Sequence, residues 1–328
     1  MERQLSRRGF MAGIAGASVL TGNRAAFADT WPSRATNIVV PFPAGGPTDV
    51  VARLLADRLR GELGQGFIVE NKTGAGGNIA ATSVVRAAPD GYTLMFSSSG
   101  PLATNKLLYK TLAFDPLADF TPVALLGDVQ GIVAVHPSVP AKSFAELVAY
   151  GKANPGKLTF GSPGFGLMGH MIGELIQRKA GFQMTHVPYR GSAPLATDLL
   201  AGTVNVAVDF IPAYIPHVKS GAVRGLAVTS DQRAPQLPEV PTVAESGLPD
   251  VNTTGWFGLV GPKGLPEPVV TRLAAITRAY VESAEGREKL AVIGVRARSG
   301  DAAAMRTAQA MEIARWADVI KSAGITLD

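Results

Sequence analysis

Hydrophobic and polar positions alternate along this chain with two periods, one typical of strands and one typical of helices. Short apolar runs predict strands at 37–42, 67–70, 92–97, 123–126, 132–135, 158–160, 185–189, 204–210, 224–229 and 256–260. Apolar residues three and four positions apart predict helices at 48–63, 78–87, 143–154, 167–180, 193–201, 268–283 and 302–323. Strands that alternate with helices are typical of an α/β fold with mainly parallel sheets.

Hydroxyl residues and glycines mark the ends of several predicted helices. Thr48 and Ser192 are predicted as N-caps, and Gly64 and Gly181 follow the last helical residues of their segments. The segment 231–249 is rich in proline, which predicts an irregular connector that runs over the surface.

The N-terminus has the pattern of an export signal. Arg7 and Arg8 are followed by Phe10, by a short and mildly apolar stretch, and by an A-x-A cleavage pattern at 26–28. These features predict a twin-arginine signal peptide over 1–28 and a periplasmic location for the rest of the chain. The apolar stretch is far shorter than the ~20 residues that a membrane span needs. The alternative is a basic, disordered N-terminus.

Composition narrows the class of protein. Hydrophobic residues make up 46% of the chain, with 37 glycines and 23 prolines, which is typical of a globular protein rich in turns. The part after the signal is long enough for two lobes of ~150 residues. Its net charge is close to neutral and no block of like charge appears, so nucleic-acid binding is disfavoured. There is no cysteine, which excludes disulfides and thiolate chemistry.

Three loops share one design, in which a strand leads through a glycine turn to the start of a helix. They are 43–49, 161–166 and 189–192. The first N–H groups of a helix have no intrahelical partner, and glycine lets a ligand approach the backbone closely. Such loops suit a carboxylate or another small anion. The alternative is that these residues only form the turn and cap the helix.

One of these loops also fits a dinucleotide motif. Gly164 to Gly169 reads G-x-G-x-x-G after a strand, and Arg190 at the end of the next strand would suit NADP. The motif lies in the middle of the chain, however, and the residues between its glycines are unusually apolar. An exported NADP-dependent oxidoreductase is therefore the alternative from another functional class.

Motifs for catalysis or metal binding are scarce. The chain has no G-x-S-x-G and no H-E-x-x-H sequence. His170 and Glu174, four apart on a predicted helix, would hold a metal or form a local hydrogen bond. Asp209 would face a cleft or cap the next turn. We expect no enzyme activity, no metal and no cofactor.

Several short sequence segments, in the same order along the chain, resemble the Bug family, the substrate-binding proteins of tripartite tricarboxylate transporters. The resemblance covers 31–328. The segments lie at 40–49, 70–78, 88–94, 153–158, 186–191 and 237–242. It implies a periplasmic-binding-protein-like fold of type II, in which two α/β lobes joined by crossing strands close on a small ligand. The lobes would be 29–132 plus 254–328, and 133–253.

The resemblance also implies which residues bind the ligand. Gly45 and Gly46 would offer N–H groups from the first loop, and the second and third loops would form the opposing side. The full set is Phe42, Pro43, Ala44, Gly45, Gly46, Thr48, Asp49, Ser97, Ser98, Ser162, Gly164, Phe165, Gly166, His170, Gly191, Ser192 and Asp209.

Three apolar side chains in the second loop distinguish this chain from the family pattern. Phe165 stands where the family usually has a polar residue, and Leu167 and Met168 where it often has hydroxyl residues. We expect them to narrow the pocket or to favour an aromatic or aliphatic acid. The resemblance implies a monomeric, exported solute-binding protein that delivers a small organic carboxylate to the membrane subunits of a transporter. A sensory binding protein is a further alternative.

Overall fold

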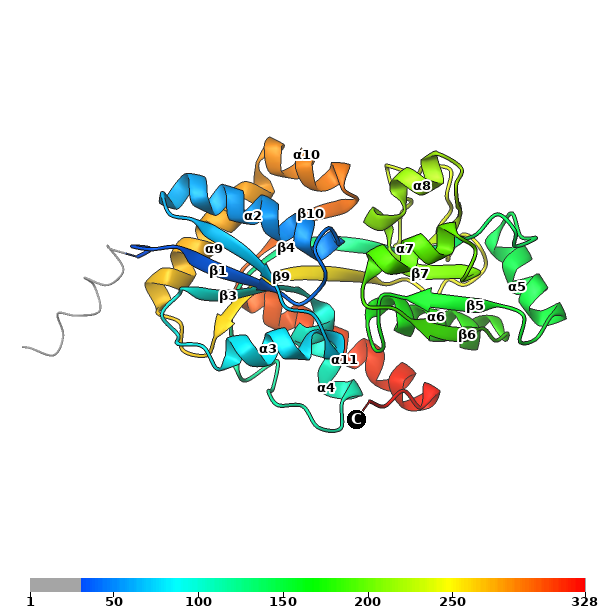
Figure 1. Ribbon diagram of the computed structural model, residues 1–328, viewed down its shortest axis with the longest axis horizontal. Helices are drawn as coiled ribbons and strands as arrows, with labels where there is room; N and C mark the ends of the chain where they lie inside the picture. The colour runs from blue at the N-terminus through cyan, green and yellow to red at the C-terminus, as the bar shows by residue number, and fades with distance from the viewer. Residues whose placement is uncertain (1–30, 328) are drawn as a thin grey trace, which may run out of the picture.

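The computed structural model describes residues 31–327, and the predicted signal peptide at 1–28 lies outside them. The described chain forms two α/β lobes, side by side in Figure 1, with long strands running between them. This confirms the predicted α/β fold and its two-lobed organisation. None of the described helices is long and apolar enough to cross a membrane.

The first lobe is built on a mixed sheet. β1 (Thr36–Val40) lies between β2 (Phe67–Asn71) and β3 (Thr93–Ser98) and is parallel to both. β9 (Thr254–Pro262) is antiparallel to β3, and the first part of β4 (Phe120–Val135) lies between β9 and β10 (Val295–Gly300). The helical segments that begin in this lobe are α2 (Pro47–Leu63), η1 (Ala75–Gly77), α3 (Asn78–Val85), η2 (Gly100–Thr104), α4 (Asn105–Leu108), α9 (Glu267–Glu282), α10 (Ala284–Val292) and α11 (Ala302–Ala323).

The second lobe repeats the design. β5 (Thr159–Ser162) lies between β6 (Thr185–Pro188) and β7 (Val206–Phe210) and is parallel to both. The second part of β4 lies between β7 and β8 (Arg224–Val228), antiparallel to each. The helical segments are α5 (Phe144–Ala153), α6 (Met168–Ala180), α7 (Ser192–Leu200), η3 (Ile211–Ala213) and α8 (Ile215–Lys219).

β4 joins the two lobes. Its partners change between Gln130, which pairs with Thr254 of β9, and Gly131, which pairs with Phe210 of β7. Thr229 ties this point together: its Oγ1 accepts the Gly131 N–H at 2.9 Å and its hydroxyl donates to the Thr253 carbonyl at 2.7 Å. The prediction of two separate strands here was wrong, because the polar, glycine-containing stretch between them remains extended.

α11 also links the lobes. Met305, near its start, belongs to the core of the first lobe, whereas Trp316 and Ile320 pack in the core of the second. Figure 1 shows this helix, in red, running along the lower side from one lobe to the other. Each core otherwise consists of fully buried apolar residues of the sheet and its helices, such as Leu55 in the first lobe and Phe160 in the second.

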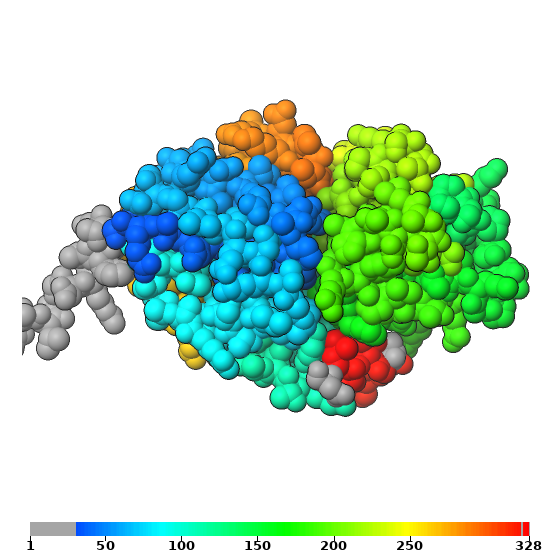
Figure 2. All heavy atoms as spheres, viewed as in Figure 1, coloured from blue at the N-terminus to red at the C-terminus, as the bar shows by residue number. Residues whose placement is uncertain are grey.

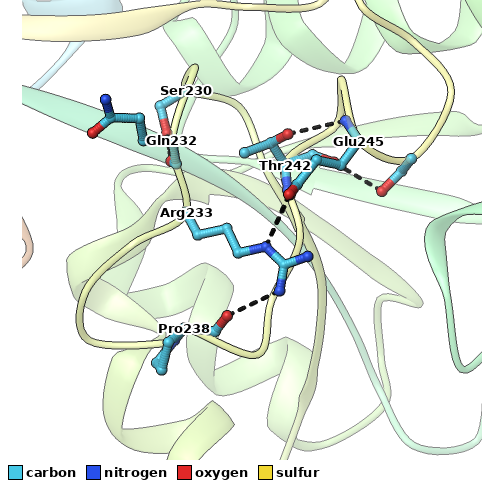
Figure 3. A network of polar contacts seen from close by, with 7 residues as sticks. Ser230, Gln232, Arg233, Pro238, Thr242 and Glu245 are labelled. Carbon is cyan, nitrogen blue, oxygen red and sulfur yellow. Dashed lines mark hydrogen bonds and ion pairs between the residues drawn. The ribbon is translucent and has the colours of Figure 1, made fainter.

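The connector 231–249 contains no helix or strand, as predicted, but it is held by a polar network. The Arg233 guanidinium donates to the Glu245 carboxylate at 2.9 Å and to the Pro238 carbonyl at 3.1 Å (Figure 3). The Glu245 carboxylate also accepts the Thr242 N–H at 2.7 Å. These bonds close the connector into loops on the second lobe.

Several details differ from the predictions. The sheets are mixed, because every ladder to β4 or β9 is antiparallel. Thr48 is not an N-cap, since α2 begins at Pro47 with Gly46 as its cap, and Ser192 is the first residue of α7, with Gly191 as the cap. α4, α8, α10 and β10, together with the short turns η1, η2 and η3, were not predicted.

Candidate functional site: a cavity between the lobes

A cavity lies between the lobes, with about 570 Å³ of space between its wall atoms when the open solvent beside it is included. Strand ends, helix starts and loops of both lobes contribute to its wall. The lining residues are Phe42, Pro43, Gly46, Pro47, Thr48, Ser98, Ser99 and Gly100 from the first lobe, and Pro163, Leu167, Met168, Gly169, Gly191, Ser192, Ala193, Asp209 and Phe210 from the second.

Three helix N-termini converge on this cavity. Thr48 of α2, Gly169 of α6 and Ser192 of α7 each lie in the first turn of their helix and in the cavity wall. The first N–H groups of a helix have no intrahelical acceptor, and they carry a partial positive charge from the helix dipole. The wall therefore presents backbone donors from both lobes to one enclosed space, which is suited to an anion.

Asp49 braces the first loop instead of facing the cavity. Its carboxylate accepts the Gly45 N–H, the Asn71 amide and two bonds from the Arg53 guanidinium, all at 2.9 Å. Burial raises the pKa of Asp49, but the bonds from Arg53, Gly45 and Asn71 outweigh burial and lower it below the ordinary value. Gly45 and Gly46 were expected to offer N–H groups to a ligand, but both N–H groups have acceptors within the loop, Asp49 and the Pro43 carbonyl.

Phe165 does not lie in the cavity wall. It is 44% exposed and packs edge-on against the rings of His170 and His186, at centroid distances of 5.1 and 5.0 Å. The two imidazoles stack on each other at 4.0 Å. His170 Nδ1 accepts the Gly166 N–H at 3.0 Å, and Ser162 Oγ lies 2.7 Å from His186 Nε2. These contacts hold the second loop, 161–166, in its conformation.

Burial keeps this histidine pair neutral. It lowers the pKa of His170 to about 4, and burial together with the neighbouring His170 lowers the pKa of His186 to about 3. His170 Nε2 lies 3.8 Å from a carboxylate oxygen of Glu174. Within residues 31–327, no three or more His, Asp or Glu side chains are grouped so that they could hold a metal.

The cavity wall is largely apolar. Leu167 and Met168, which were expected to narrow the pocket, both line it, together with Phe42 and Phe210. The polar residues that line it are Thr48, Ser98, Ser99, Ser192 and Asp209. Asp209 is 1% exposed, and burial raises its pKa to about 7 although Phe210, Ser192 and Tyr214 donate hydrogen bonds to it.

The structure brings some of the predicted site residues into the wall and leaves others beside it. In the wall are Phe42, Pro43, Gly46, Thr48, Ser98, Gly191, Ser192 and Asp209. Outside it are Ala44, Gly45, Asp49, Ser97, Ser162, Gly164, Phe165, Gly166 and His170. Pro47 and Pro163, which also line the cavity, lie within the predicted loops 43–49 and 161–166. Sequence reasoning missed Ser99, Gly100, Gly169, Ala193 and Phe210, each of which lies one or two positions from a residue that it had named.

The lobes touch across the cavity mouth. A Cβ atom built on Gly191 would lie 2.9 Å from Pro43 Cδ, and one built on Gly100 would lie 3.0 Å from a methyl of Leu167. Figure 2 shows the atoms of the two lobes meeting along the seam between them. The protein is therefore in a closed arrangement around its cavity.

A cavity that lies between two α/β lobes and is lined by helix N-termini defines a two-lobed ligand-binding protein. Residues 51–325 match the family described as "Tripartite tricarboxylate transporter family receptor". The chain belongs to this family. Solved periplasmic binding proteins share its fold, which confirms the expected type II architecture.

Three relatives illustrate the match. "Protein BugT" of Bordetella pertussis is 37% identical over 301 residues, which cover 92% of each chain. The structure of "R. palustris Rpa4515 with adipate" is 41% identical, with a TM-score of 0.88, and the match covers 90% of this chain and 99% of that one. "MatC (Rpa3494) from Rhodopseudomonas palustris with bound malate" is 34% identical, with a TM-score of 0.83 and coverage of 88% and 100%.

The family consists of transport receptors, so the chain is not an enzyme. The oxidoreductase alternative is not favoured. Arg190, which would have suited NADP, is exposed and does not line the cavity.

Proposed function

We propose that this protein is an exported solute-binding protein that captures a small organic carboxylate between its lobes. It would then deliver that ligand to the membrane subunits of a tripartite tricarboxylate-type transporter. The observation that carries the proposal is the convergence of the α2, α6 and α7 N-termini on one closed cavity. The bound adipate and malate named for two similar structures support the carboxylate class.

The cavity wall supports a weakly polar ligand. Leu167, Met168, Phe42 and Phe210 would pack against a hydrocarbon chain or ring, while backbone N–H groups would take the carboxylate oxygens. A strongly polar ligand would leave hydrogen-bonding groups unpaired against these side chains, which is costly in a buried site. We therefore place aliphatic and aromatic acids ahead of short, heavily hydroxylated ones.

We propose the lobes as 29–132 plus 254–328, and 133–253. The change of β4 partners between Gln130 and Gly131, and the start of β9 at Thr254, support these limits. Closure would occur by bending at this point, where β4 and the segment before β9 cross between the lobes. The last turns of α11 pack on the second lobe and would move with it or slide over it.

A thermal-shift screen tests the proposal. The purified protein is mixed with mono-, di- and aromatic carboxylates, and with the neutral diols or amides of the same carbon skeletons as controls. A ligand at 100 times its dissociation constant adds about 2.7 kcal/mol of stability. We expect stabilisation by at least one acid and none by its neutral counterpart. Stabilisation only by sugars or by cationic amines would contradict the proposal.

We also propose export to the periplasm by the twin-arginine route, on the basis of Arg7 and Arg8. Replacing both by lysine should leave the uncleaved precursor in the cytoplasm, whereas changing Arg3 should not. Cell fractionation and the mass of the protein measure the result. Normal export of the double-lysine variant would contradict this route.

A further inference from the structure

The cavity wall contains an acidic residue and no basic residue, which is unusual for a site that would bind an anion. Asp209, at the end of β7, is the one charged residue in its wall, and none of the described lysines, arginines or histidines lines it. An organic anion that enters would meet a negative group and no positive side chain. The backbone donors carry only partial charges, so no full positive charge in the wall balances the Asp209 carboxylate.

We propose that Asp209 couples ligand capture to proton uptake, taking one proton from water when a carboxylate enters and donating that O–H to the ligand. The inference rests on the proposed function and adds to it a specificity-determining residue. The proton balance is simple: one O–H bond forms on the carboxyl of Asp209, the solvent loses one proton, and no other bond changes.

Three donors around Asp209 favour its ionised form, and only burial opposes them. Its Oδ1 accepts the Phe210 N–H at 2.6 Å, and its Oδ2 accepts the Tyr214 hydroxyl at 3.2 Å. Ser192, in the first turn of α7, also donates to it. No ion pair joins Asp209 to a cation within residues 31–327. The group is therefore fixed in orientation by neutral donors, and it belongs to a residue that lines the cavity.

The titratable groups on the elements around β7 do not compensate the charge. They are His170, Glu174, Arg178 and Lys179 on α6, Asp198 on α7, Tyr214 before α8, and His217 and Lys219 on α8. Of these, only Tyr214 forms a hydrogen bond with Asp209 in the described part of the chain. Asp198 accepts instead from the Tyr189 hydroxyl at 2.9 Å.

Two carboxylates that share one buried site do not both stay ionised, and one of them holds a proton at a much higher pH than usual. Burial already raises the pKa of Asp209 to about 7, so a second negative group beside it would raise it further. Ligand and proton therefore bind together, and each favours the other.

Calorimetry in buffers of different ionisation enthalpy counts the protons taken up with the ligand. The probes are adipate and hexanoate, each titrated into the purified protein at pH 6 and pH 8. For the wild type we expect about one proton per ligand at pH 8, little uptake at pH 6, and affinity about tenfold weaker at pH 8. Asp209→Asn should bind with no uptake and with equal affinity at the two pH values. Asp198→Asn, an acid outside the cavity, should behave as the wild type.

The possible results separate the two proposals. Binding without proton uptake by the wild type, or uptake that persists in Asp209→Asn, would overturn the inference and leave the proposed function intact. Failure of every carboxylate to bind would remove the proposed function.

A measurement without ligand tests the inference about Asp209 even if no carboxylate binds. A carboxyl whose pKa is raised on folding stabilises the fold at low pH and loses this contribution as the pH rises through the folded value, here about 7. The Tm of the wild type should fall relative to that of Asp209→Asn between pH 5 and pH 8. Tyr214→Phe, which removes a donor to the carboxylate, should shift this change to higher pH. Parallel curves for all three proteins would overturn the inference.

Discussion

Gly191 shows how a single residue can set the distance between the lobes. It has φ of +113°, a conformation that L side chains rarely adopt, and its Cα faces Pro43 of the opposite lobe. A side chain at this position would have to occupy the space in which the two loops meet. The residue thus serves both the turn before α7 and the closure of the cavity.

We predict that Gly191→Ala weakens both the fold and ligand binding, whereas a control variant weakens the fold alone. With φ of 113° and ψ of 173°, Gly191 lies in a backbone region almost confined to glycine, which costs an L residue roughly 1–3 kcal/mol. The added Cβ would also hold Pro43 away. Gly221→Ala is the matched control, because Gly221 has φ of +75° and open space around its Cβ position. Both variants should lose Tm, Gly191→Ala more than Gly221→Ala, but only Gly191→Ala should lose affinity, by roughly tenfold or about 1.4 kcal/mol. Equal affinities would show that the loops do not meet here in the bound state.

We predict that Asp49→Ala loosens the first loop and weakens both stability and binding. It leaves the Gly45 N–H, the Asn71 amide and the Arg53 guanidinium without their shared acceptor, a loss of roughly 1–3 kcal/mol. Asp57→Ala, on the exposed side of the same helix, should change stability by less than about 0.5 kcal/mol. Urea unfolding measures both.

The pH dependence of that loss has a definite sign. The pKa of Asp49 is lowered on folding, so its contribution is present above the ordinary value of 3.8 and is lost as the pH falls below it. The difference between wild type and Asp49→Ala should therefore shrink on acidification. A difference that grows in acid would contradict the role of Asp49 as an ionised brace.

At the residue scale, the sequence identified the loops better than it identified the direction of their side chains. Phe165 was expected in the pocket because it stands in the second loop where the family usually has a polar residue, yet it packs on the histidine pair. The stacking depends on His186, which comes from the next strand along the chain. No local pattern predicts a contact of this kind.

At the scale of elements, the junction of β4, β8 and β9 is where closure must be accommodated. Thr229 is fully buried there and bonds to the backbone on both sides of the crossing. It thereby holds Gly131 of β4 against the segment that enters β9. This single hydroxyl satisfies a buried N–H group and a buried carbonyl.

We predict that Thr229→Val destabilises the protein by roughly 1–3 kcal/mol, because it leaves both backbone groups unpaired without changing the side chain's volume much. Thr277→Val is the matched control: Thr277 is also fully buried, but its hydroxyl has no hydrogen-bond partner in the described structure. That variant should be neutral or slightly stabilising. Equal losses in urea unfolding would show that the crossing does not depend on Thr229.

Element by element, the strongly periodic segments were predictable and the partner-dependent ones were not. α2, α6 and α11 follow their apolar spacing and end at glycines in the left-handed conformation. β10 carries two arginines that pair with Asp128 of β4, so its extended form depends on a strand more than 160 residues away. α10 is short and charged, and its sequence alone gives little helical periodicity.

At the scale of the whole molecule, the site exists only because the two lobes close on each other. Each lobe alone would present helix N-termini to solvent, where a carboxylate is already well hydrated. Between the lobes the same donors face an enclosed space with apolar walls, and their interaction with an anion is stronger there. The sequence indicated the three loops, but only the pairing along β4 shows that they meet in one cavity.

A crystal structure of the protein with a bound carboxylate, chosen from the thermal-shift screen, tests this account most directly. We predict that the carboxylate oxygens lie about 2.7–3.2 Å from backbone nitrogens at the starts of α2 and α7, with the ligand's carbon chain against Leu167 and Met168. A carboxylate held by an arginine or lysine side chain outside this cavity would contradict it.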